Sequence, residues 1–80
     1  MKISVLFFGI TTDLVGASQL QMEVEQNCSI ASFKTVLKDK FSQLEKINSY
    51  AIAINEEYAT AASILKESDV VAIIPPVSGG

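Results

Sequence analysis

The run Val70-Val71-Ala72-Ile73-Ile74 constrains the fold of this 80-residue chain more than any other segment. Asp69 precedes the run, and Pro75 and Pro76 close it. Proline fixes φ and has no N–H, so the strand must end there and the chain leaves in an extended form. A β-branched run that is apolar on both faces is typical of a strand at the centre of a sheet. The sequence therefore predicts a central strand close to residue 80.

Other segments have the alternating pattern of strands, with one face apolar and the other polar or mixed. We predict strands at residues 3–8, 20–25, 50–54 and 58–60. In the first of these, Ile3, Val5 and Phe7 share one face, which leaves Leu6 and Phe8 on the other.

A single long helix is predicted between these strands. Ser29 is a good N-cap, and the next twelve residues repeat apolar side chains at helical spacing. The stripe predicted to face the core consists of Ile30, Phe33, Val36, Leu37 and Phe41.

The connections are predicted from turn residues and polarity. We expect a loop at 10–18 with Gly16 as a turn residue and a polar connection at 43–48. We also expect a turn at 55–57 with a left-handed Asn55, and a crossover at 61–68 anchored by Ile64 and Leu65.

Two strands, one helix and then more strands predict an α+β domain. The simplest arrangement is a mixed sheet of four to five strands with one main helix across one face and the first and last strands paired at its centre. This is the ubiquitin-like β-grasp. We assign residues 1–76 to this domain and 77–80 to a flexible tail.

The chain has more apolar residues than one small core can hide, since it is 49% hydrophobic and only 19% charged. With one long helix, nothing is left to cover the sheet face that carries Leu6, Phe8 and Ile74. We interpret this face as a partner-binding patch, the alternative being a harmless face partly shielded by loops.

The composition also excludes several classes of function. The chain has no histidine and no arginine, so general acid–base catalysis, metal binding and nucleic-acid recognition are not expected. Cys28 stands alone, and we expect an inert, semi-buried thiol rather than a sulfur relay. No segment has the length of a membrane span or the pattern of a secretory signal, so we expect a cytoplasmic protein. Because the side chains of a catalytic site are missing, we also expect no active site of its own.

The final segment Pro75-Pro76-Val77-Ser78-Gly79-Gly80 suggests where chemistry takes place. Glycine has no Cβ, so Gly79 and Gly80 would pass through a slot too narrow for other residues and present the terminal carboxylate. A frayed end is the alternative interpretation.

These features together resemble the sulfur-carrier subunits of molybdopterin synthase, over the whole chain. The matching segments are Val5-Leu6-Phe7-Phe8-Gly9, Leu14-Val15-Gly16, Asn55-Glu56-Glu57-Tyr58, Asp69-Val70-Val71-Ala72 and Ile73 to Gly80. The chain departs from the family pattern at Ile10-Thr11-Thr12-Asp13, where an arginine is usual, and at Ser68, where glycine is usual.

The resemblance implies a mechanism that uses partner proteins. An adenylyltransferase of the ubiquitin-activating type would use ATP to adenylate Gly80, and the adenylate would become a thiocarboxylate that donates sulfur to a cyclic pyranopterin precursor. The large catalytic subunit would form a heterotetramer with the carrier and receive Val77, Ser78 and Gly79. The residues expected at the interface are Leu6, Phe8, Tyr58 and Ile74. No bound cofactor is implied.

Two alternatives stay open. Related β-grasp proteins that end in Gly-Gly carry sulfur for thiamine thiazole synthesis, and others are protein modifiers joined to target lysines, here through Gly80.

Overall fold

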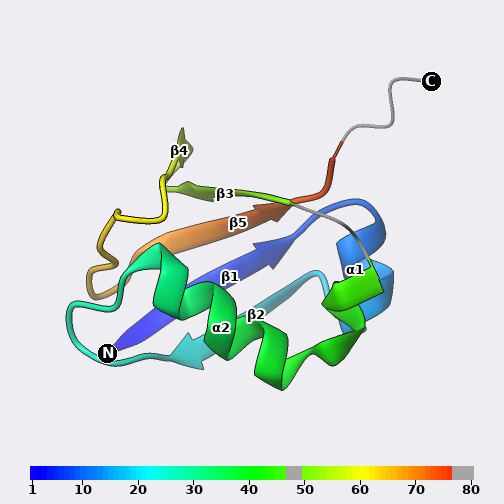
Figure 1. The fold of residues 1–80 in the computed structure, drawn as a ribbon, viewed down its shortest axis with the longest axis horizontal. Coiled ribbons are helices and arrows are strands. Elements are labelled where there is room, and N and C mark those ends of the chain that lie inside the picture. Colours follow the sequence, from blue (N-terminus) through cyan, green and yellow to red (C-terminus); the bar gives the residue numbers. More distant parts are fainter. Residues whose placement is uncertain (47–49, 77–80) are drawn as a thin grey trace.

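The computed structural model describes residues 1–46 and 50–76 of the chain (Figure 1). The elements follow in the order β1 (Lys2–Phe7), α1 (Ile10–Val15), β2 (Gln19–Glu23), α2 (Ile30–Lys40), the 3₁₀ helix η1 (Ser42–Lys46), β3 (Ala51–Ile54), β4 (Glu57–Tyr58) and β5 (Val70–Ile74).

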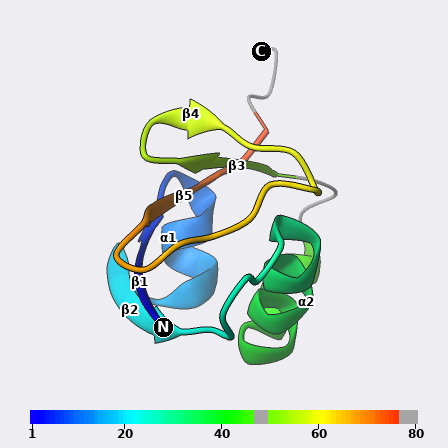
Figure 2. The ribbon, with the colours of Figure 1, turned by 90° about the vertical axis from the view of Figure 1, so that its left-hand side faces the viewer.

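The strands form one mixed sheet in the order β2-β1-β5-β3-β4. Strand β5 lies at its centre, parallel to β1 and antiparallel to β3. In Figures 1 and 2, α1 and α2 lie on the same side of this sheet. The predicted β-grasp, with the first and last strands adjacent, is therefore confirmed.

The core lies between α2 and the sheet face that carries Val5 and Val71, a pair of β1 and β5. Both valines have an exposed fraction of 0%, as have Phe33 and Leu37 of α2. Burying each such side chain contributes about 1.5–3 kcal/mol, so helix and sheet stabilise each other mainly through this contact.

Helix α2 begins where the cap predicts. The Ser29 hydroxyl oxygen accepts a hydrogen bond from the Ser32 amide at 3.2 Å, which satisfies one of the free amides of the first turn. The predicted stripe is wrong at one position, because the Val36 side chain is 41% exposed. Val36 lies one residue before Leu37, so the rotation that buries Leu37 fully carries Val36 towards solvent.

The loop predicted at 10–18 is wrong, because helix α1 occupies Ile10–Val15. Gly16 does end the segment: it has φ 86° and donates its amide to the Thr12 carbonyl oxygen at 2.8 Å. Thr11 is completely buried, and its hydroxyl donates to the Phe8 carbonyl oxygen. Tertiary burial therefore stabilises a helix that begins with weak helix formers.

The β3–β4 hairpin turns on two left-handed residues, Asn55 with φ 49° and Glu56 with φ 72°. Two such residues in a two-residue loop match the right-handed twist of the strands they join. The left-handed conformation of Glu56 was not predicted. Because the turn is shorter than the predicted 55–57, β4 begins at Glu57 instead of Tyr58. In the crossover that follows, Leu65 is 1% exposed as expected. The Ile64 side chain is 46% exposed, so Ile64 holds the crossover through its backbone bridge to Ser29 and not through burial.

Candidate functional site

The candidate site lies on the outer face of the sheet, opposite the helices. One row of side chains crosses this face through cross-strand pairs, from Leu6 to Ala72, from Ala72 to Ala53 and from Ala53 to Tyr58. The side chains of Leu6 and Tyr58 therefore lie on one surface of the sheet. Two small residues, Ala72 and Ala53, lie between them.

A second row lies nearer the end of β5. Ile74 pairs with Ala51 of β3, and continuing the β1–β5 register by one residue places Phe8 beside Ile74. The Phe8 amide donates to the Ile73 carbonyl oxygen at 3.2 Å, which fixes this proximity. The structure therefore brings together the predicted interface residues, which we call the docking patch: Leu6, Phe8, Tyr58 and Ile74.

The docking patch is open to solvent. Phe8 is 48% exposed and Tyr58 76% exposed, while Leu6 and Ile74 are half-buried. Figure 2 shows the helices on the other side of the sheet. None of the side chains in the two rows, all from described residues, is charged, which is the composition expected at the core of a protein interface.

The chain directly after β5 packs against the turn that follows β1. Gly9 has φ 55°, and a Cβ at this position would lie 3.0 Å from Cγ of Pro75. The Gly9 carbonyl oxygen accepts the Thr12 amide at 3.1 Å, so α1 holds the turn in place. Pro75 therefore leaves the sheet beside Phe8. The predicted tail residues Val77, Ser78, Gly79 and Gly80 lie outside the described residues.

Cys28 behaves as a structural thiol. It is 8% exposed, and burial, followed by the charge of Glu25, raises the pKa of its thiol above the ordinary value of 9.0. A raised pKa leaves little reactive thiolate at neutral pH, which agrees with the prediction of an inert residue.

Residues 1–46 and 50–76 contain no group of three or more metal-ligating side chains that could hold an ion. In the same ranges, no helix has the length and hydropathy needed to cross a bilayer.

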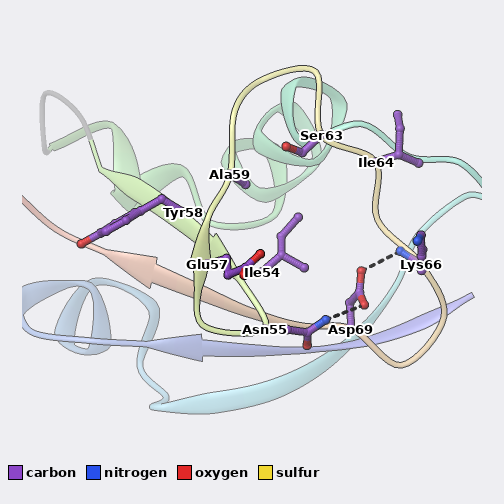
Figure 3. A pocket seen from close by; sticks show the side chains of 9 residues that line it. All are labelled: Ile54, Asn55, Glu57, Tyr58, Ala59, Ser63, Ile64, Lys66 and Asp69. Atoms are coloured by element: carbon purple, nitrogen blue, oxygen red, sulfur yellow. Dashed lines mark hydrogen bonds between the residues drawn. The ribbon is translucent and has the colours of Figure 1, made fainter.

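Sequence reasoning missed a hollow with a volume of about 260 Å³ (Figure 3). It lies between the β3–β4 hairpin and the crossover to β5. At its base the Asp69 carboxylate accepts the Asn55 side-chain amide at 2.9 Å and the Lys66 backbone amide at 2.8 Å. The only sequence signals were a turn-forming asparagine and an aspartate before a strand, which are common in ordinary loops.

Comparison with known proteins gives a consistent result. The model of the ThiS family matches residues 5–80. A molybdopterin synthase sulfur carrier subunit of Arabidopsis thaliana is 36% identical over 81 residues, which cover 100% of this chain and 84% of that protein.

Solved structures agree in fold. A chain in the protein–protein complex of subunits 1 and 2 of molybdopterin-converting factor from Helicobacter pylori 26695 superimposes with a TM-score of 0.70 at 26% identity, covering 100% of both chains. SAMP1 from Haloferax volcanii superimposes with a TM-score of 0.86 at 19% identity, again covering 100% of both chains, and shows the shared fold.

Proposed function

Because the chain belongs to the ThiS family, we propose that it is the sulfur-carrier subunit of a molybdopterin synthase. The observation that carries the proposal is the position of the docking patch at the point where β5 ends and the chain continues towards Gly80. A partner that covers Phe8 and Ile74 is thereby placed to receive the tail.

The proposed chemistry begins at the Gly80 carboxylate. A carboxylate is a poor electrophile because its charge is delocalised, so one of its oxygens first attacks the α-phosphorus of ATP and pyrophosphate leaves. A donor then supplies sulfur at the oxidation level of sulfide. This sulfur forms a bond to the acyl carbon, the bond between that carbon and the AMP oxygen breaks, and AMP departs. The product is a terminal thiocarboxylate. The adenylyltransferase partner supplies the ATP site, since this chain contributes the acceptor group alone.

In the second stage, the tail enters the large catalytic subunit. The thiocarboxylate sulfur is anionic and nucleophilic at neutral pH, so it needs no histidine on the carrier to attack a cyclic pyranopterin precursor. It would attack a carbon that bears an oxygen substituent, and that substituent leaves as the C–S bond forms. Hydrolysis of the resulting thioester returns the Gly80 carboxylate and leaves the sulfur on the pterin. Two such transfers provide the two sulfurs of the dithiolene, consistent with a heterotetramer of two carriers and two large subunits.

The docking patch supplies binding free energy for this step. Ordering the backbone of each tail residue costs about 1–2 kcal/mol. Burying an exposed large apolar side chain recovers about 1.5–3 kcal/mol. Phe8, Tyr58 and Ile74 together can therefore offset the ordering of residues 77–80 inside a partner.

The test is intact-mass analysis of the purified chain after incubation with the adenylyltransferase, ATP and a sulfur donor. We expect one terminal oxygen to be exchanged for sulfur, and a Gly80 deletion to remain unmodified. The sulfurated protein should then yield molybdopterin with the large subunit. Sulfuration without molybdopterin, together with rescue of cells lacking a thiazole-synthesis carrier, would overturn the assignment. A ladder of lysine conjugates would instead indicate a protein modifier.

A further inference from the structure

Strand β2 forms one edge of the sheet and β4 forms the other (Figure 1). An exposed edge offers unpaired N–H and C=O groups to any other strand, so proteins usually keep it very short or protect it with proline, lysine or a bulge. Strand β4 is two residues long. Strand β2 is five residues long, and its sequence Gln19-Leu20-Gln21-Met22-Glu23 contains no proline, glycine or lysine. Of the two edges, that of β2 is therefore suited to pairing with a further strand.

The hydrogen bonds between β1 and β2 show which backbone groups of β2 point away from the sheet. Met1 and Val24 exchange two hydrogen bonds, at 2.7 and 2.9 Å. Bonded and non-bonded pairs alternate along an antiparallel ladder, so Met22 and Leu20 also bond to β1. The residues between them turn their N–H and C=O groups to the free side. We call these residues the β2 edge: Gln19, Gln21 and Glu23.

The β2 edge is open along its whole length. Within residues 1–46 and 50–76, no backbone hydrogen bond from another segment reaches its three N–H or its three C=O groups. The side chains of its three residues are exposed as well. A strand laid beside β2 would therefore meet a complete set of unpaired backbone groups.

A second copy of the chain fits this edge by symmetry. In an antiparallel pairing centred on Gln21, Gln21 lies opposite its equivalent, and Gln19 lies opposite Glu23 of the second copy. All residues of the β2 edge then form hydrogen-bonded pairs. A shift by one residue would place free groups opposite groups already bonded to β1, so the pattern of free groups restricts the register.

The side chains agree with this register, because opposite residues of an antiparallel pair share a face. The Gln19 side-chain amide can donate to the Glu23 carboxylate of the second copy, and the symmetry repeats this contact. The two Glu23 residues lie four residues apart along the paired strands, about 14 Å. This distance exceeds the screening length of about 8 Å at physiological ionic strength. On the opposite face, the half-buried Leu20 gains an apolar neighbour in Met22 of the second copy.

We propose that the β2 edge pairs with the β2 edge of a second copy of this chain, antiparallel and centred on Gln21, and joins two five-stranded sheets into one. The symmetry axis is perpendicular to the sheet, so both docking patches face the same side and stay available. The inference does not depend on the proposed function, because the pairing uses neither the tail nor the docking patch. One strand from each chain makes a small interface, so the association should be weak and reversible.

The first test measures self-association of the purified chain by sedimentation equilibrium, up to about 1 mM, where weak specific contacts are populated. Gln21→Pro removes an N–H that points away from β1, which an edge strand tolerates. The pair loses two hydrogen bonds by symmetry, so its dissociation constant should rise about tenfold or more. Gln21→Thr keeps the N–H and favours a strand, so this matched control should stay within about threefold of the unaltered chain. Circular dichroism checks that both variants are folded.

The second test uses charge. Gln19→Glu places like charges opposite each other twice in the pair and should weaken association about tenfold. Gln19→Lys places a cation opposite Glu23 and should tighten association about threefold. Gln43→Glu and Gln43→Lys are the controls, because Gln43 is exposed in η1 and the change in net charge is the same.

Opposite effects of the two Gln19 substitutions, with loss of association in Gln21→Pro, support the proposal. A monomer at every concentration overturns it, as do equal effects at Gln19 and Gln43 or equal losses in Gln21→Pro and Gln21→Thr. Loss of association in Phe8→Asp, with none in Gln21→Pro, would place the contact on the docking patch and also overturn it. If Gln21→Pro does not fold, the comparison of Gln19 with Gln43 decides.

Discussion

The backbone amide of Phe8 donates a hydrogen bond to the carbonyl oxygen of Ile73 at 3.2 Å. This bond joins the residue after β1 to the penultimate residue of β5. The backbone at Phe8 and the end of β5 are therefore held together by two central strands. Side-chain substitution at Phe8 can change the surface without breaking this connection.

The first prediction concerns that surface. Phe8→Asp should weaken binding to the large subunit by about a hundredfold or more, because it removes a large apolar contact and buries a charge in its place. Since Phe8 is 48% exposed, the fold should persist. Val36→Asp on α2, which is 41% exposed on the helix side, is the control and should bind normally. Calorimetry measures affinity, and circular dichroism checks folding.

The second prediction concerns Ser68, which has φ 69°. A left-handed conformation costs a residue with a Cβ about 1–2 kcal/mol, whereas glycine loses about 0.5–1 kcal/mol in chain entropy. Ser68→Gly should therefore raise the free energy of unfolding by about 0.5–1 kcal/mol in urea titrations. Ser42→Gly, at the start of η1, should lower it, and stabilisation by both would contradict the conformational explanation.

The third prediction concerns Asn55, which forms a hydrogen bond to Asp69 and accepts one from the Val70 amide at 3.0 Å. Asn55→Ala loses both bonds and places alanine at φ 49°. The free energy of unfolding should fall by about 2–4 kcal/mol, given about 0.5–1.5 kcal/mol per bond and the left-handed cost. Asn55→Gly keeps the turn and should lose only the hydrogen-bond part. Identical losses in both variants would show that the conformation contributes nothing.

The fourth prediction tests the packing of α2 on the sheet. Phe33 is 0% exposed, and Phe33→Ala should cost about 3–5 kcal/mol of stability, a large part of what a domain of this size has. Val36→Ala, three residues later on the exposed side, should cost less than about 1 kcal/mol. Comparable losses at both positions would contradict the orientation of the helix.

The fifth prediction concerns high pH. Burial raises the pKa of Cys28 above its ordinary value of 9.0 and that of Tyr50 above 10.0. The folded state therefore holds both protons more tightly than the unfolded state. Their contribution to stability is fully present below these ordinary values and is lost as pH rises through the raised values.

Melting temperatures measured from pH 8 upward should therefore begin to fall near the ordinary value for Cys28, 9.0, and fall further above that for Tyr50, 10.0. Cys28→Ala should remove the first part of this decline and leave the second. A decline of the same shape in Cys28→Ala would mean that other groups cause it.

The strands were predictable because their side chains alternate. Ile3, Val5 and Phe7 are buried as predicted. Val71 and Ile73 of the central strand lie beside them on the same face of the sheet. This alternation is a property of the extended backbone itself, so it can be read without knowing the tertiary contacts.

Helix α1 was not predictable in the same way. Its first three residues, Ile10, Thr11 and Thr12, are β-branched, and Gly9 provides no side-chain cap. Such residues lose χ1 freedom in a helix, so their sequence indicates a loop. The helix is stabilised by burial of Thr11 and by contacts of Leu14 and Val15 with the core, which depend on the completed fold.

The candidate site was predictable in part because strand side chains alternate between the two faces of the sheet. Leu6, Phe8 and Ile74 reach the outer face by alternation, and Tyr58 was placed there by resemblance. The hollow between the β3–β4 hairpin and the crossover was not predicted, because it depends on two left-handed residues and on a crossover in which Leu65 turns inward and Ile64 does not.

The parallel pairing of β1 with β5 has a mechanical consequence. The register runs from Ser4 opposite Val70 to Phe7 opposite Ile73, so a pull applied between Lys2 and Pro76 acts along both strands in opposite directions. Figure 1 shows the N-terminus and the end of β5 at opposite ends of the strand pair. Such a load shears the whole ladder at once instead of peeling its hydrogen bonds singly. The domain would therefore withstand tension on its tail when a partner grips the tail and another still holds the sheet.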